Sequence, residues 1–177
     1  MLGNAVKLLV VAGMKNYVYR FGNEIRIQNS GGPIGLGLTG EVADCIMIDW
    51  DRKLLEKLNS LGINPEIYAR YKDDITVVTK RLEKGTCFRN GILLIDTEKK
   101  TLDENKKDEI VTMEVVNEIA NTIDPMIQLT IDVPSTHPNN KLPILDLRVN
   151  VNKERKNRID FEFYEKPTRN KKVILFD

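Results

Sequence analysis

Apolar residues recur at helical spacing in three segments of the chain. The clearest stripe runs at three- and four-residue intervals over residues 36–61, which predicts one long amphipathic helix closed by Gly62. The same spacing predicts helices over 4–17 and 108–123. The first of these contains the short apolar run 8–12, which we interpret as a helix packing in a core and not as a signal peptide.

Other segments alternate apolar and polar residues, which is the period of a β-strand. Gly22-Asn23 between two such runs is a hairpin signal. The predicted hairpins pair 17–21 with 24–28, 67–71 with 75–79, and 145–151 with 159–164, with single strands at 91–96 and 126–132. Loops are expected at 85–90, 98–108 and 134–141. Hairpins with helices between them indicate an α+β fold, with helices on one face of an antiparallel sheet.

Composition fits a soluble globular domain. The 177 residues are 41% hydrophobic and 30% charged, with a net charge of +1. Charge is unevenly spread, because residues 153–172 carry a net charge of +4 and residues 96–124 a net charge of −5. The basic stretch suits either a phosphate backbone or a solvated turn and tail.

Cysteine and histidine usage excludes two kinds of site. The chain has two cysteines, Cys45 and Cys87, and one histidine, His137, so neither a zinc site nor a disulfide is expected. Cys45 is expected in the core, on the long helix. We expect an intracellular protein, nuclear or cytoplasmic, with no membrane contact.

Two motifs carry candidate chemistry. In Tyr71-Lys72-Asp73-Asp74, adjacent carboxylates stand at the tip of a predicted hairpin, where paired carboxylates can hold a divalent metal. Upstream, the segment 28–35 reads Gln-x-x-Gly-x-Pro-x-Gly before the long helix. A glycine-rich turn at a helix start leaves backbone N–H groups for phosphate or a nucleotide sugar. Each motif alone has a plain alternative, a turn or a connecting loop.

Together the two motifs resemble the palm of reverse transcriptases, in which this loop and helix precede a Tyr-x-Asp-Asp hairpin. The segment 141–147, Lys-Leu-Pro-Ile-Leu-Asp-Leu, is similar to the Leu-Pro-Phe-Leu-Asp segment of retroelement polymerases. The segment 163–168, Phe-Tyr-Glu-Lys-Pro-Thr, is similar to their Tyr-x-Lys-Pro-Thr segment. These two point to the Penelope-like elements and their relatives. The resemblance spans about residues 16–168.

The resemblance implies RNA-directed DNA polymerisation by two-metal nucleotidyl transfer, with Mg²⁺ or Mn²⁺. It makes Asp73 and Asp74 the catalytic metal ligands, with Asp73 the firmer one. Residues implied to shape the nucleotide and template site are Gln28, Gly31, Pro33, Gly35 and Tyr71. Residues implied to contact primer or nucleic acid are Leu142, Asp146, Lys166 and Thr168. Asp146 also has the alternative of an inward polar residue satisfied by backbone N–H groups. The partners implied are an RNA template, a DNA primer and deoxynucleoside triphosphates.

The largest departure from the family pattern is the absence of a third carboxylate. Reverse transcriptases carry an Asp-x-x-x-x-aromatic strand before the glycine loop, and this sequence has no acid before Glu24. We therefore expect one partial polymerase domain, inactive alone, completed by an N-terminal half in cis or in trans. Its expected parts are 1–27, a palm core 28–80, a variable insertion 81–125 and a primer-grip region 126–177.

Three alternatives remain open beside this expectation. The first is a catalytically dead reverse-transcriptase-like module that binds nucleic acid or protein. The second is an RNA-dependent RNA polymerase, although those usually carry Gly at the position of Tyr71. The third is an unrelated α+β domain with a turn of two aspartates.

Overall fold

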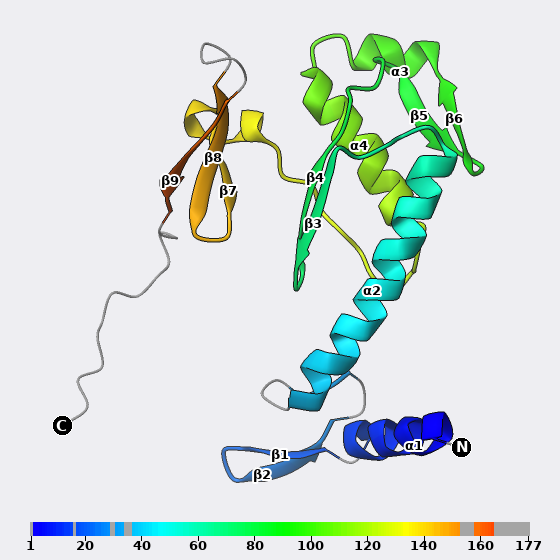
Figure 1. Ribbon diagram of the computed structural model, residues 1–177, viewed down its shortest axis with the longest axis vertical. Helices are drawn as coiled ribbons and strands as arrows, with labels where there is room; N and C mark the ends of the chain where they lie inside the picture. The colour runs from blue at the N-terminus through cyan, green and yellow to red at the C-terminus, as the bar shows by residue number, and fades with distance from the viewer. Residues whose placement is uncertain (1, 16, 29–30, 34–36, 153–157, 165–177) are drawn as a thin grey trace, which may run out of the picture. The chain divides into compact units, whose positions relative to one another are not determined.

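The computed structural model describes residues 2–15, 17–28, 31–33, 37–152 and 158–164 (Figure 1). The chain divides by its internal contacts into two compact units, residues 1–52 and 53–177. Each unit is described by itself. The sequence-based expectation of one partial domain stays a prediction.

The first unit holds helix α1 (Leu2–Lys15), a hairpin and the start of a long helix. Strands β1 (Val18–Phe21) and β2 (Glu24–Ile27) are antiparallel, and Gly22 has a φ of +61° in their turn. Helix α2 (Gly37–Ser60) follows. The predicted helices and hairpin are confirmed. Cys45 is exposed, so its expected place in a core is wrong, and Leu8 and Leu9 of the apolar run are exposed as well.

Gly62 ends α2 as predicted. Its φ is +78°, and its N–H donates to the carbonyl of Asn59 at 3.0 Å. The next N–H, of Ile63, reaches back to the carbonyl of Leu58 at 2.9 Å. This pair of bonds is the Schellman arrangement, in which a left-handed residue satisfies the last helical carbonyls. Ile63 itself is buried, which fixes the exit of the chain from the helix.

The second unit contains the remaining elements. Its helices are α3 (Thr97–Leu102) and α4 (Asp108–Ala120), with short 3-10 turns at Pro134–Thr136 and Pro138–Asn140. Its strands are β3 (Ile67–Tyr71), β4 (Asp74–Val78), β5 (Thr86–Arg89), β6 (Ile92–Ile95), β7 (Leu142–Ile144), β8 (Leu147–Asn152) and β9 (Arg158–Phe163). The α+β class is therefore confirmed.

The described strands form four small antiparallel sheets. Three are two-stranded hairpins, β1–β2, β3–β4 and β5–β6, and the fourth has the order β7-β8-β9. The hairpins at 67–79 and 145–164 were predicted, and β7 extends the second of them by one strand.

Two expected loops have regular structure instead. Residues 86–89 form β5, and residues 97–102 form α3. Asp96 caps α3, because its side chain accepts the N–H groups of Glu98 and Lys99 at 2.9 and 3.1 Å. Gly85 has a φ of +84° and sits where a Cβ would lie 2.8 Å from the Asp96 carbonyl oxygen, so glycine lets the two segments meet.

The predicted strand at 126–132 is wrong. No strand is assigned between α4 and β7 in this described stretch. The side chain of Asn121 takes the place of a partner strand: its Oδ1 accepts the N–H of Leu129 at 2.6 Å and its Nδ2 donates to the same residue's carbonyl at 3.1 Å. The alternating apolar residues of this segment predict a strand, but one side chain provides the backbone hydrogen bonds that a neighbouring strand would provide.

The core of the second unit lies around α4. Buried residues on this helix are Val111, Thr112, Val115, Val116, Ile119 and Ala120. They are joined by Leu54 and Leu58 from the end of α2, and by Cys87 and Val133. The helical spacing predicts a buried stripe of Ile110, Met113, Val116, Ala120 and Ile123, but only Val116 and Ala120 of these are buried. Thr112 enters the stripe because its hydroxyl donates to the Asp108 carbonyl and accepts the N–H of Leu82.

Candidate functional site

The Asp-Asp hairpin has a two-residue turn. Tyr71 of β3 is paired with Asp74 of β4, and Lys72 and Asp73 connect them. Lys72 has a φ of +57°, a conformation that turns of the primed type require and that glycine or asparagine adopts more easily. The guanidinium of Arg70 donates to the carbonyl of Lys72 at 3.0 Å and supports the turn. The predicted hairpin tip is therefore present, and Lys72 and Asp73 form its turn.

The two faces of this hairpin differ. Tyr68, Arg70, Ile75 and Val77 lie on one face and are half-buried. Tyr71 and Asp74 lie opposite each other on the other face, and both are exposed. That exposed face also carries Ile67 and Val78 among its large apolar residues.

Both carboxylates at the tip are open to solvent. Asp73 stands in the turn and Asp74 is the first residue of β4, so both side chains lie at one end of the hairpin. A divalent cation bound there takes only part of its oxygen shell from the protein. No group of three or more His, Cys, Asp or Glu side chains able to hold a metal occurs among the described residues.

The glycine loop is described in part. The N–H of Gln28 donates to the carbonyl of Tyr17 at 3.0 Å, which joins the loop to the start of the β1–β2 hairpin. Gly31 has a φ of +72°, and Pro33 is buried. Helix α2 begins at Gly37, so Pro33 precedes its first turn instead of entering it. Gly35 lies outside the described residues.

Gly32 explains why this loop is glycine-rich. A Cβ at this position would lie 2.4 Å from a methyl carbon of Thr39 and 2.8 Å from the terminal carbon of Met14. Only glycine fits between these side chains without a shift. The loop belongs to the first unit and the Asp-Asp hairpin to the second, and each has been described within its own unit.

The implied primer contacts lie in the β7–β9 sheet where they are described. Leu142 is the first residue of β7 and half-buried. Asp146 is exposed in the turn between β7 and β8, and its carbonyl accepts the N–H of Tyr164 at 2.7 Å. The alternative of an inward Asp146 is therefore wrong. Lys166 and Thr168 lie outside the described residues.

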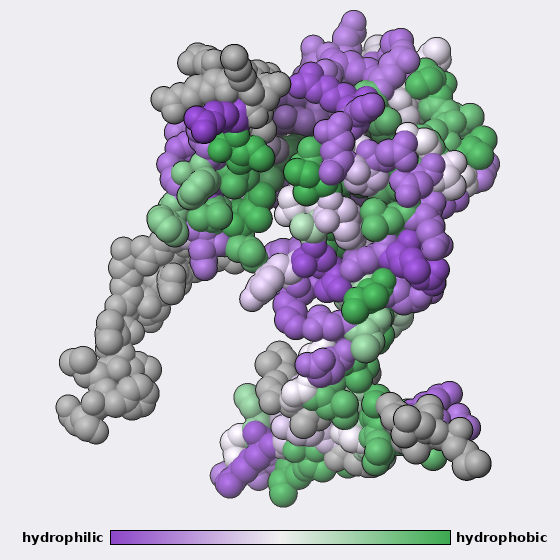
Figure 2. Space-filling view, viewed as in Figure 1, coloured by the Kyte–Doolittle hydropathy of each residue, from purple (hydrophilic) through white to green (hydrophobic). Residues whose placement is uncertain are grey.

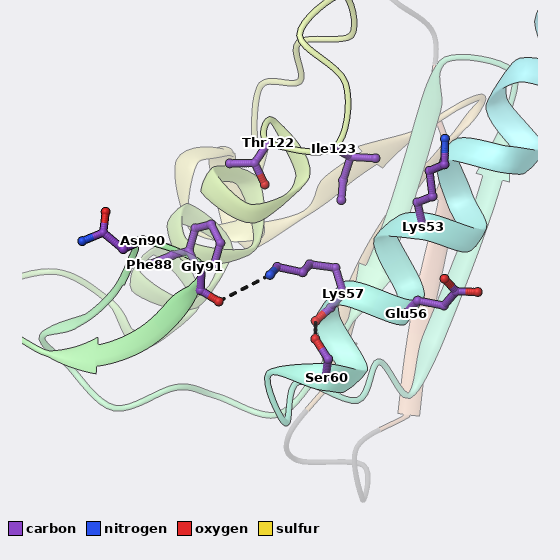
Figure 3. Close-up of a pocket in the computed structure, with 9 residues that line it drawn as sticks. All are labelled: Lys53, Glu56, Lys57, Ser60, Phe88, Asn90, Gly91, Thr122 and Ile123. Atoms are coloured by element: carbon purple, nitrogen blue, oxygen red, sulfur yellow. Dashed lines mark hydrogen bonds between the residues drawn. The ribbon is translucent and has the colours of Figure 1, made fainter.

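Sequence reasoning missed an open hollow of about 810 Å³ in the second unit (Figure 3). It lies between the last turns of α2, the β5–β6 turn and the residues after α4. The ammonium of Lys57 lies 5.5 Å from the centre of the Phe88 ring and 3.4 Å from the carbonyl oxygen of Gly91. Lys53 stands one helical turn before Lys57, and this i, i+4 spacing places both side chains on one face of α2.

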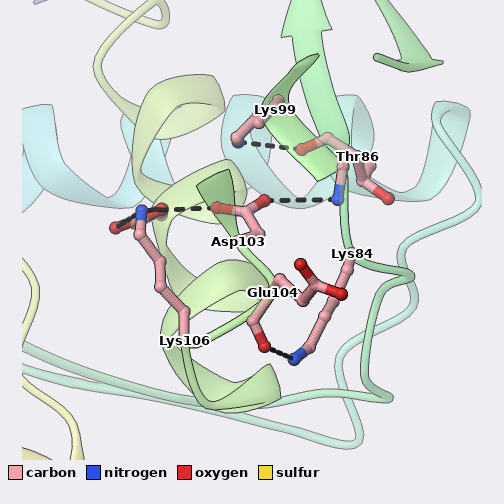
Figure 4. Close-up of polar contacts among 8 residues, drawn as sticks. Lys84, Thr86, Lys99, Asp103, Glu104 and Lys106 are labelled. Carbon is pink, nitrogen blue, oxygen red and sulfur yellow. Dashed lines mark hydrogen bonds and ion pairs between the residues drawn. The ribbon is translucent and has the colours of Figure 1, made fainter. Parts of the chain in front are cut away.

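A second missed feature is a cluster of polar contacts around Asp103 (Figure 4). Asp103 is fully buried, and one carboxylate oxygen accepts the N–H of Gly85 at 3.2 Å. The ammonium of Lys106 lies 3.4 Å from the other oxygen and 2.9 Å from the carboxylate of Glu114. The hydrogen bond to Glu114 raises the pKa of Lys106. An ammonium already fills the space between these carboxylates, so the cluster is structural.

Comparisons with protein-family models, with curated proteins and with solved structures found no match for this chain. Among the described residues, no helix is both long enough and apolar enough to cross a membrane. The resemblance to reverse transcriptases therefore rests on the sequence motifs alone and stays a prediction.

Proposed function

We propose that this chain is a palm segment of a reverse transcriptase, in which Asp73 and Asp74 bind Mg²⁺ or Mn²⁺ for nucleotidyl transfer. The observation that carries the proposal is the Asp-Asp hairpin itself. Its two-residue turn brings both carboxylates to one solvent-open tip, next to exposed Tyr71. Carboxylates gathered at such a tip can hold a divalent cation for nucleotidyl transfer.

The proposed palm also needs a sheet larger than this hairpin. A two-stranded hairpin is marginally stable by itself, and further strands stabilise it. Among the described residues β3 and β4 pair only with each other, and their outer face exposes Ile67, Tyr71 and Val78. We propose that a strand bearing the third carboxylate completes this sheet, in cis or in trans. RNA template, DNA primer and deoxynucleoside triphosphates are the proposed partners.

The first experiment is a titration of the purified chain with Mg²⁺ and Mn²⁺, followed by NMR. We expect saturable binding with a Kd on the order of 1 mM, because two carboxylates supply only part of a cation's shell. Shifts and Mn²⁺ broadening should centre on residues 71–75. Asp73→Asn/Asp74→Asn should abolish both effects.

Glu66→Gln is the matched control. Glu66 is exposed and precedes the same hairpin at its opposite end, where its N–H donates to the Val78 carbonyl. The Glu66→Gln substitution removes a negative charge without changing the tip of the hairpin, so metal binding should persist. Equal binding by the wild-type and double-variant chains would remove the metal site and with it the proposal.

A second candidate is a binding module without catalysis. It is favoured by the lack of any group of three metal-binding side chains among the described residues. This candidate predicts that a primer–template duplex binds equally well to the wild type and to the Asp73→Asn/Asp74→Asn variant, with or without Mg²⁺. Under the leading proposal we expect no DNA synthesis by this chain alone, and synthesis by it would contradict that expectation.

A further inference from the structure

Strand β9 is an outer edge of the β7–β8–β9 sheet (Figure 1). Within the described part of the chain it pairs with β8 alone, over all six residues from Leu147↔Phe163 to Asn152↔Arg158. Every residue of β9 is exposed. An exposed edge of this length is a template for pairing with another strand.

One hydrogen bond shows which backbone N–H and C=O groups of β9 point toward β8 and which point away from it. The N–H of Tyr164 donates to the carbonyl of Asp146 and continues the β8–β9 ladder one step past Phe163. Because N–H and C=O groups alternate between the two sides of a strand, those of residues 158, 160 and 162 point toward β8. Those of Ile159, Phe161 and Phe163 point outward, where a new strand would meet them.

The side chains of β9 also alternate. Ile159, Phe161 and Phe163 share one face of the sheet and are 61%, 67% and 88% exposed. On the same face, the register adds Leu142, Ile144, Leu147 and Val149 from β7 and β8. Apolar residues are gathered over this sheet in Figure 2. Arg158, Asp160 and Glu162 share the opposite face, so the strand is amphipathic.

This strand is complementary to a second copy of itself. An antiparallel pair keeps both apolar faces together only if opposite residue numbers sum to an even value. Centred on Asp160, the pairing sets each Arg158 opposite Glu162 of the other copy and each Ile159 opposite Phe161. It also sets the two Asp160 carboxylates opposite each other, so one like-charge pair stands against two opposite-charge pairs. Centred on Phe161, it sets Asp160 opposite Glu162 twice, which is repulsive. Centred on Ile159, it joins only three residues of each strand.

Glu162 can accept the additional partner. Its carboxylate already bonds the ammonium of Lys141 and lies 3.8 Å from the guanidinium of Arg148. A carboxylate has about four acceptor sites, so an arginine from a second copy can join these two cations. The pairs of residues 158 and 162 fall at positions without ladder hydrogen bonds, where opposite side chains lie closest.

We propose that β9 is the homodimerisation edge of this chain, pairing antiparallel with β9 of a second copy about a twofold axis at Asp160. Ile159 and Phe161 exchange four backbone hydrogen bonds with the second copy. The result is a six-stranded sheet whose apolar face is continuous across both copies.

Cysteine cross-linking tests the register in the full-length chain. The background is Cys45→Ser, since Cys45 is exposed and Cys87 is buried. Asp160→Cys should give a covalent dimer on mild oxidation, because Cα atoms at such opposite positions lie about 4.5 Å apart, within disulfide range. Ile159→Cys and Phe161→Cys should each fail alone and cross-link when mixed. Equal cross-linking of all three single variants, or of none, would overturn the proposal.

Charge exchange tests the same edge without a covalent bond. Arg158→Glu and Glu162→Arg should each weaken dimerisation about tenfold in sedimentation equilibrium, because each places like charges opposite one another twice. An equimolar mixture of the two should restore it, since both contacts then join opposite charges. Circular dichroism checks that each variant is folded. A wild-type chain that stays monomeric at its highest soluble concentration contradicts the dimer.

Discussion

At the scale of single residues, Asp103 is the charged side chain most deeply buried among those described. One oxygen accepts the N–H of Gly85, and the other has the Lys106 ammonium at 3.4 Å as an ion-pair partner. This contact is an ion pair without a hydrogen bond, so the second oxygen is held by charge. Such a group stabilises the fold only while its partners are present.

We predict that Asp103→Ala destabilises the second unit by about 3 kcal/mol, because it leaves the Gly85 N–H buried without an acceptor and removes a carboxylate from Lys106. Asp103→Asn keeps an acceptor for Gly85 and should cost about 1 kcal/mol. Urea unfolding followed by circular dichroism measures both. Glu104→Ala is the control, because the Glu104 side chain is exposed and the bonds of this residue to Lys84 and Thr101 are made by its backbone. A loss as large in the control would refute this role.

Asp103 and the aspartates of the tip show which residues sequence alone could predict. The partners of Asp73 and Asp74 are their neighbours in the turn, so local turn chemistry was enough to place them. Asp103 lies in a charged stretch that reads as a surface loop. Its burial depends on Gly85, eighteen residues away, and on a lysine that also reaches Glu114. Contacts between distant segments of this kind leave no periodic signal.

At the scale of elements, the Asp-Asp hairpin depends on the left-handed conformation of Lys72. We predict that Lys72→Gly keeps metal binding and strengthens the hairpin by about 1 kcal/mol, because glycine adopts this φ without steric cost. Lys72→Pro should weaken metal binding at least as much as losing one aspartate, since proline holds φ near −65°. Amide hydrogen exchange in β3 and β4 reports the hairpin, and Mn²⁺ broadening reports binding.

The two Lys72 variants separate shape from charge. Both remove the same ammonium and keep Asp73 and Asp74, so a difference between them comes from the backbone of the turn. If both variants bind Mn²⁺ equally, the carboxylates act as independent surface charges and the geometry of the tip is irrelevant to the proposed function.

Sequence patterns predict elements that depend on local periodicity better than elements that depend on contacts with distant residues. The apolar stripe and the glycine cap of helix α2 both lie within one continuous segment of the chain. The segment 126–132 has an alternating pattern too, but Asn121 satisfies its backbone in place of a strand. The buried stripe of α4 likewise depends on Thr112 bonding Leu82, a partner outside the helix.

At the scale of the whole molecule, the buried core is concentrated in the second unit. Among the described residues, Pro33 and Trp50 are buried in the first unit, and the other buried apolar residues lie between Leu54 and Val133. Three ionisable groups of this unit have shifted pKa values that tie its stability to pH. The N–H of Lys99 lowers the pKa of Asp96, the Lys141 ammonium lowers that of Glu162, and Glu114 raises that of Lys106.

The lowered and raised pKa values limit the stability of the fold at opposite ends of the pH range. Asp96 and Glu162 stabilise the fold fully above their ordinary pKa values of about 4, and this stabilisation is lost as pH falls through the lowered folded-state values. Lys106 stabilises it below an ordinary value of about 10.4, and this is lost as pH rises through the raised value. We therefore predict a plateau of melting temperature between about pH 5 and pH 10, with a decline on each side.

Circular dichroism melts across this range check the prediction, and two variants assign its limits. Asp96→Asn should change stability little at neutral pH, because asparagine also caps helices, while making the acid decline shallower. Lys106→Met should lower stability at neutral pH and flatten the alkaline decline, since it removes the titrating group. An acid decline that is unchanged in Asp96→Asn would mean that the cap of α3 does not couple folding to protonation, leaving Glu162 as the group responsible.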